Sequence, residues 1–84
     1  PADGMADMHL DMSGGAAVLA TMGAIAALNL RVNVLAVIAA AENMPSGLSY
    51  RQGDIIKSYS GKTIEIGNTD AEGRVVLADA ISYA

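Results

Sequence analysis

An apolar stretch near the start of the chain has the spacing of a helix. Between Gly15 and Leu28 large apolar residues recur every three or four positions, and alanines occupy much of the remaining surface. The large residues of this stripe are Val18, Leu19, Met22, Ile25 and Leu28. Because a helix that is apolar on nearly all sides is enclosed by neighbouring structure, we expect a buried helix that ends near Asn29.

The stretch that follows this helix is apolar without alternation. From Val32 to Ala41 several residues are β-branched, and Asn33 is the only polar interruption. A continuous apolar run of this kind predicts a central strand covered on both faces, as in parallel sheets with helices on either side. We interpret Met8 to Met12 as a further short strand, which would complete a β-α-β unit with the helix and the central strand.

The second half of the chain predicts a hairpin and a helix. Ile55 to Tyr59 and Lys62 to Ile66 are short strand-like segments on either side of a Ser-Gly pair that is typical of a turn. Val75 to Ala84 carries an apolar stripe with helical spacing. The expected fold class is therefore α/β, a fragment of a mixed β-sheet flanked by helices.

The composition limits the chain to one small domain. Its 84 residues carry five basic and nine acidic side chains, for a net charge of −4, and 52% of them are hydrophobic. That apolar content excludes a disordered tail, and the absence of cysteine excludes disulfides. There is no Phe or Trp to fill an independent core. We therefore expect residues 1–84 to be a piece of a larger domain.

The charge pattern narrows the range of partners. An acidic chain without a basic stripe is not typical of proteins that bind nucleic acid or anionic membranes. The first residues are acidic where a secretory signal would be basic. The longest run without a polar residue, 34–41, is much shorter than the roughly 20 residues that span a bilayer. We expect neither nucleic acid nor a membrane as a partner.

Four charged residues form the candidate site: Asp11, Asp70, Glu72 and Arg74. In an extended or looping segment, the alternating positions 70, 72 and 74 point to the same side. Two carboxylates held together repel each other unless a positive group lies between them, and a divalent cation fills that role most directly. Arg74 would add a fixed positive group that can grip a carboxylate or carbonate.

Structural explanations compete with this hypothesis. Thr69 and Glu72 have the spacing of a helix capping box, and Asp11 stands where a helix begins. A lone His9 without a second ligand at metal spacing is more often structural. Methionines such as Met8 beside Asp11 more often fill a core than line a substrate pocket. Spacing alone therefore leaves a carboxylate site open without favouring it.

Several motifs resemble the leucine aminopeptidase (cytosol aminopeptidase) family. The segment Asn68 to Arg74 matches most of the family's signature peptide. Asp11 to Ala17 and Glu42 to Gly47 agree with two further blocks in order and spacing. Tyr50 to Asp54 and Ser60 to Thr63 are also similar to the family. The resemblance extends essentially from Met5 to Ala84.

The resemblance implies a two-metal aminopeptidase of the zinc-peptidase-like α/β type, with two adjacent Zn, Mn or Mg ions. It implies that Asp11, Asp70 and Glu72 are metal ligands, with Glu72 bridging both ions. Arg74 would hold a carbonate ion that acts as general base, and Met8 would line the substrate pocket. The family further implies a cytoplasmic homohexamer that removes N-terminal, leucine-like residues from peptides.

The family's remaining metal ligands and its catalytic lysine are expected upstream of residue 1. We therefore expect residues 1–84 to be part of the catalytic domain, without the amino-terminal domain or either flank, and to be inactive in isolation. An alternative is a non-catalytic relative that keeps the fold for assembly or binding. An independent carboxylate metal-binding module is disfavoured, because so few residues can hardly cover both faces of the expected central strand.

Overall fold

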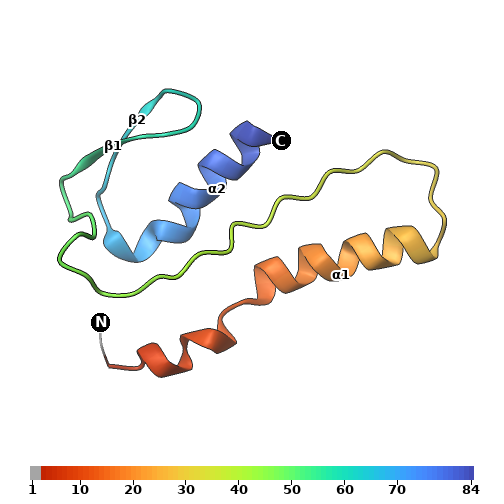
Figure 1. Cartoon of the computed structure of the whole chain (residues 1–84), viewed down its shortest axis with the longest axis horizontal. Helices are drawn as coiled ribbons and strands as arrows, with labels where there is room; N and C mark the ends of the chain where they lie inside the picture. Colours follow the sequence, from red (N-terminus) through yellow and green to blue (C-terminus); the bar gives the residue numbers. More distant parts are fainter. Residues whose placement is uncertain (1–2) are drawn as a thin grey trace. The chain divides into compact units, whose positions relative to one another are not determined.

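The computed structural model describes residues 3–84, which divide into two compact units (Figure 1). The first unit comprises Pro1–Ile38 and the second Ala39–Ala84. The described elements are two α-helices, two 3-10 helices and one two-stranded sheet. This content agrees with the expected α/β class, while the larger mixed sheet of a zinc-peptidase-like domain remains a prediction.

The first unit is dominated by helix α1, Ser13–Ala27, close to the predicted range. The helix ends in a Schellman motif, because the Leu30 N–H donates to the Ile25 carbonyl and the Asn29 N–H donates to the Ala26 carbonyl, at 3.3 and 3.1 Å. Asn29 adopts a φ of 50°, the left-handed conformation that this motif requires. The predicted stop at Asn29 is thus confirmed.

The strand predicted at Met8 to Met12 is wrong. Met5–Leu10 forms a 3-10 helix, η1, whose first turn is closed by the Asp7 N–H on the Gly4 carbonyl at 3.0 Å. Gly4 supports that turn because its φ of 81° is the left-handed conformation in which glycine is favoured. A strand needs a neighbour for its backbone hydrogen bonds, and the described part of the first unit contains none.

The prediction of a central strand from Val32 to Ala41 is also wrong. These residues have no regular secondary structure and follow an open trace in Figure 1. Local apolar content favours a strand, but the strand forms only when other strands lie beside it. Part of the segment instead lies along α1, where a Cβ on Gly15 would be 3.6 Å from Ile38 Cγ2.

Helix α1 is not buried, contrary to expectation. None of its residues falls in the buried class, and Leu19 is 66% exposed. The helical stretch Met5–Ala27 is long and apolar enough to cross a membrane by length and composition alone. This is weak evidence for a membrane span, because the core helix of a soluble protein passes the same test. The non-helical residues 11 and 12 also interrupt the stretch.

The second unit contains the predicted hairpin. Strands β1, Ile55–Lys57, and β2, Thr63–Glu65, pair antiparallel, with Ile56 opposite Ile64. At the turn, the Ser58 N–H donates to the Lys62 carbonyl at 2.8 Å, and Gly61 supplies a φ of 84°. The strands are shorter than predicted, but the hairpin and its turn are confirmed.

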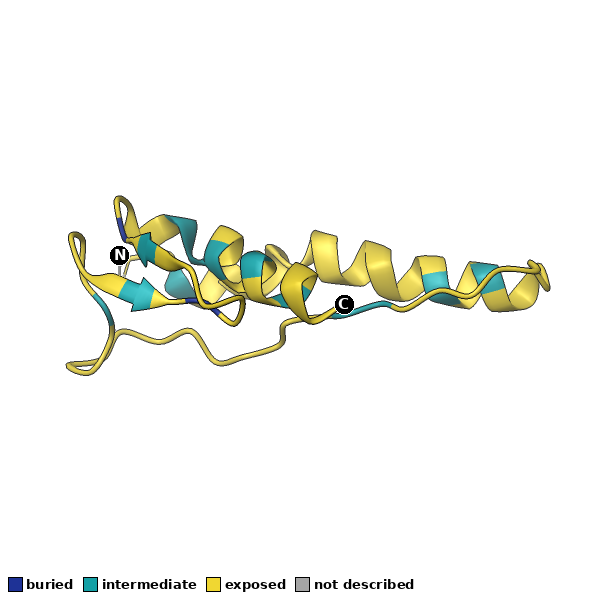
Figure 2. Cartoon of the chain, turned by 90° about the horizontal axis from the view of Figure 1, so that it is seen from above, coloured by how far each residue is buried: buried dark blue, intermediate teal, exposed yellow. Residues whose placement is uncertain are grey.

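Helix α2, Glu72–Tyr83, lies against this hairpin and is preceded by the 3-10 helix η2, Thr69–Ala71 (Figure 1). It begins three residues before the predicted Val75. Figure 2 shows the pattern of burial, in which most residues are exposed. Among the described residues only Ile66, at 2% exposure, and Ser58 are buried. The small core of this unit therefore sits where the hairpin leads into α2.

Candidate functional site

The signature segment occupies the turn between the hairpin and α2. Ile66 is buried at the end of β2, and its N–H donates to the Asp54 carbonyl at 2.8 Å. Asn68 is extended, with φ −150° and ψ 121°, and its Oδ1 accepts a hydrogen bond from the Asp70 N–H at 2.9 Å. A buried anchor and a side-chain cap thus fix the start of the segment that carries Asp70, Glu72 and Arg74.

The capping role proposed for the carboxylates is filled by another residue. Asn68, not Thr69, is the N-cap of η2, and the N-cap position of α2 is Ala71, which makes no side-chain cap hydrogen bond. The capping box predicted from Thr69 and Glu72 is therefore wrong. Asp70 and Glu72 lie in the first turns of their helices, so their carboxylates face the positive ends of the helix dipoles.

Residues 70, 72 and 74 do not lie in an extended or looping segment that would point them to the same side, contrary to the prediction. Residues 69–71 form a 3-10 helix and residues 72–83 an α-helix, so the segment is not extended. Because successive residues of an α-helix are rotated by about 100°, Glu72 and Arg74 point in different directions. Glu72 is half-buried, whereas Asp70 and Arg74 are exposed. The roles of these residues remain predictions.

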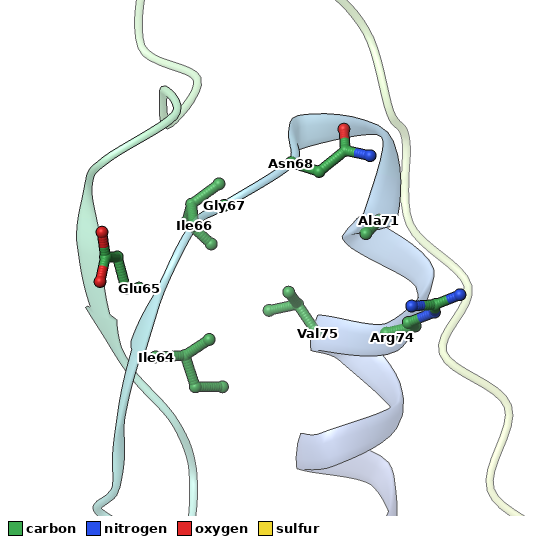
Figure 3. A pocket seen from close by; sticks show the side chains of 8 residues that line it. All are labelled: Ile64, Glu65, Ile66, Gly67, Asn68, Ala71, Arg74 and Val75. Carbon is green, nitrogen blue, oxygen red and sulfur yellow. The ribbon is translucent and has the colours of Figure 1, made fainter.

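An open apolar hollow of about 180 Å³ lies between β2 and α2 (Figure 3). Ile64, Ile66 and Val75 point toward one another across it, while the Arg74 side chain is directed away from them. The remaining lining residues are Glu65, Gly67, Asn68 and Ala71. The hollow therefore belongs to the packing of the hairpin on the helix.

Asp11 and Met8 belong to the first unit. The Asp11 N–H donates to the Met8 carbonyl at 3.0 Å, which places both residues on one turn at the end of η1. Asp11 does not cap α1, because the N-cap position is Met12 and it makes no side-chain cap hydrogen bond. Met8 is 48% exposed, so it does not serve as a core residue in this unit. The Nδ1 of His9 donates to the Ala6 carbonyl at 2.7 Å, in line with a structural role.

The structure thus gives two partial groupings, Met8 with Asp11 in one unit and Asp70 with Glu72 and Arg74 in the other. Within residues 3–84, no three His, Cys, Asp or Glu side chains come close enough together to hold a metal ion. The donor chemistry nevertheless suits divalent metals, because carboxylate oxygens are preferred by Mg²⁺ and Mn²⁺ and accepted by Zn²⁺. The cap of η2 is supplied by Asn68 rather than by either carboxylate.

Sequence reasoning missed two contacts. The Asn68 cap could have been found, because asparagine followed by a turn commonly accepts the N–H two residues on. The contact between the Tyr59 N–H and Asp79 Oδ1, at 2.8 Å, joins residues 20 positions apart. No local pattern signals a pairing of that kind.

Comparison with known proteins places these observations in a family. The model of the cytosol aminopeptidase family, catalytic domain, matches residues 1–84. A probable cytosol aminopeptidase of Roseiflexus castenholzii is 61% identical over 84 residues, which is all of this chain and 17% of that protein. The probable cytosol aminopeptidase of Aeromonas hydrophila is 59% identical over 99% of this chain and 16% of that protein. That of Clostridium tetani is 61% identical over 100% of this chain and 18% of that protein.

The chain therefore spans about one sixth of the length of these relatives. No solved structure matches it. The family match covers every residue that carries the candidate site, from Met8 to Arg74. The chain belongs to the cytosol aminopeptidase family, and the family model that it matches is that of the catalytic domain.

Proposed function

We propose that the protein containing this chain is a two-metal aminopeptidase that removes N-terminal residues, preferentially leucine-like ones, from peptides. The observation that carries the proposal is the turn Asn68–Arg74. There Asn68 takes over the capping, so the Asp70 and Glu72 carboxylates remain available. The family match over residues 1–84 supports the same activity.

Asp11, Asp70 and Glu72 are the proposed metal ligands of this chain, with Glu72 shared between two ions. When bound, a pair of divalent ions would supply an activated water and would polarise the peptide carbonyl. Zn²⁺, Mn²⁺ and Mg²⁺ all accept carboxylate oxygen. The half-buried environment of Glu72 suits a ligand that must keep a defined position, while the exposed Asp70 suits a more exchangeable site.

The other site residues act on the substrate and the proton. The Arg74 guanidinium presents several donors in a planar fork, so it can bind a carbonate ion bidentately and hold it as a base. Met8 offers an exposed, flexible apolar surface for the side chain of the substrate's first residue. Because apolar pockets separate side chains that differ by a methylene by only about 1–3 kcal/mol, we expect broad specificity.

The proposal extends to the setting of the enzyme. Its relatives are named cytosol aminopeptidases, which supports a cytoplasmic location. We also propose a homohexamer, as in the family that the chain resembles. The remaining ligands would come from parts of the protein outside residues 1–84, since these residues span about one sixth of the relatives.

The test uses the full-length protein that contains this chain. Asp70→Ala and Glu72→Ala should each lower leucine release from a leucyl anilide at least about 100-fold, because even residues that only support a metal ligand cost 10–100-fold. Bound metal, measured by atomic emission, should fall with activity. Glu65→Gln, which alters an exposed carboxylate in β2, should change neither.

Two outcomes would contradict the proposal. Full activity in Asp70→Ala would exclude this residue as a ligand. A wild-type protein that binds no divalent metal and releases no leucine would instead support a non-catalytic relative that keeps the fold for assembly or binding.

A further inference from the structure

Helix α2 is attached to the hairpin at its far end by a contact that no local sequence pattern predicts. The Tyr59 N–H, in the turn that follows β1, donates to Asp79 Oδ1 at 2.8 Å. One helical turn further along, the ring of Tyr83 meets the ring of Tyr59 edge-on, with centroids 6.0 Å apart and planes at 65°. Asp79 and Tyr83 therefore hold the C-terminal half of α2 against the tip of the hairpin (Figure 1).

The near end of the helix is held by a separate set of contacts. Buried Ile66 packs at the end of β2, and Asn68 fixes the entry into η2 through the Asp70 N–H. Between the two ends, Val75 faces Ile64 across the open hollow. Since that hollow is open, side-chain packing under the first turn of the helix constrains the helix angle only weakly.

A helix is a rigid rod, so its direction is set by two well-separated attachment points. Asp79 lies seven positions beyond Glu72 along α2, a rise of about 10 Å at 1.5 Å per residue. Because the near end is held, a small displacement at Asp79 tilts the helix about that end and so changes the direction in which Glu72 and Arg74 project from the first turn. The carboxylate of Asp79 is exposed, so water competes with Tyr59 for it and its effect should be moderate.

We infer that Asp79 is a positioning residue, which orients the first turn of α2, with Glu72 and Arg74, by accepting the Tyr59 N–H. The expected effect on metal affinity rests on the proposed function. The expected effect on the conformation of the turn rests on the structure alone. Asp79 lies seven positions beyond Glu72 along α2, so any effect on that proposed ligand is transmitted through the helix. The required property is a hydrogen-bond acceptor at this position rather than a negative charge.

The experiment compares three variants of the full-length protein. Asp79→Ala removes the acceptor, Asp79→Asn keeps a carbonyl oxygen without the charge, and Ser82→Ala is the control. Ser82 lies on the same helix, but its hydroxyl donates only to the Ala78 carbonyl within that helix, at 2.7 Å. The readouts are amide hydrogen exchange at Tyr59 and Asp70, Mn²⁺ affinity by calorimetry, and kcat and KM for a leucyl anilide.

In Asp79→Ala we expect exchange about 10-fold faster at Tyr59 and accelerated at Asp70, with Mn²⁺ affinity about 10-fold weaker and a lower kcat. Asp79→Asn and Ser82→Ala should resemble wild type in every readout. If Asp79→Ala lowers only the melting temperature, with Asp70 exchange and Mn²⁺ affinity unchanged, Asp79 merely stabilises the fold and the inference is overturned.

Failure of Asp79→Ala to fold would leave Asp79→Asn as the deciding variant. Loss of Tyr59 protection or of Mn²⁺ affinity in Asp79→Asn would show that the charge matters, which also overturns the inference. A wild-type protein without Mn²⁺ binding or peptidase activity would refute the proposed function alone. The exchange rates at Tyr59 and Asp70 would still decide whether Asp79 positions the turn.

Discussion

Asn68 is the residue on which the conformation of the candidate site depends most directly. The backbone of Asn68 is extended and leads from the hairpin into the turn. Its Oδ1 accepts the Asp70 N–H, which is one of the N–H groups at the start of a helix that have no partner within the helix. Asparagine, threonine and aspartate can all cap helices, so the succession Asn68, Thr69 and Asp70 offers three candidates. Only the backbone conformation decides among them, which explains why spacing alone does not identify Asn68 as the cap.

This cap can be tested by single substitutions in the full-length protein. Asn68→Ala removes the acceptor and should cost about 1 kcal/mol of stability, as cap losses usually do. Asn68→Asp keeps an oxygen in the same place and should stay close to wild type. Chemical denaturation, together with amide exchange at Asp70, measures both. Equal exchange at Asp70 in Asn68→Ala and wild type would show that the bond is not formed in solution.

At the scale of elements, the sequence predicts those whose hydrogen bonds are local. Helix α1, the hairpin and α2 all appear close to their predicted places, because their partners lie within a few residues or across a short turn. The strand predicted at Val32 to Ala41 depends on neighbouring strands, and the described residues supply none for it. The apolar pattern of Val32 to Ala41 indicates packing against other structure and does not by itself favour a strand.

Gly61, in the hairpin turn, and Gly47, in the turn that precedes the hairpin, form a matched pair of glycines for a test. Gly61 has a φ of 84°, whereas Gly47 does not adopt this left-handed conformation, and neither has a neighbouring atom within 4 Å of an added Cβ. Gly61→Ala in the full-length protein should therefore cost about 1 kcal/mol through backbone strain. Gly47→Ala should be neutral or slightly stabilising, since it only restricts the unfolded chain.

Thermal unfolding of the two glycine variants gives the comparison directly. A lower melting temperature for Gly61→Ala alone would confirm the turn. Equal melting temperatures for both variants would contradict the assigned conformation at Gly61. The hairpin carries Tyr59, so a weakened turn should also increase amide exchange at that residue.

At the scale of the whole molecule, the amount of exposed apolar surface dominates. Large apolar side chains in α1 and in the segment after it are among those left in water; Leu19, Leu28, Val32 and Leu35 are each more than half exposed. Surface of this extent calls for cover by further protein, in agreement with the one-sixth share of the relatives.

The isolated 84-residue chain should therefore be unable to work as an enzyme. With Ile66 the only buried apolar residue among those described, the free energy from burial is too small to fix Asp11, Asp70 and Glu72 in one arrangement. We expect no cooperative thermal transition by circular dichroism, strong binding of a hydrophobic dye, and no leucine release from a leucyl anilide with added Mn²⁺. The full-length protein, assayed in parallel, is the control for substrate and metal. Turnover by the isolated chain that Asp70→Ala abolishes would show that these residues assemble a working site by themselves, and that the surrounding protein is needed only for stability.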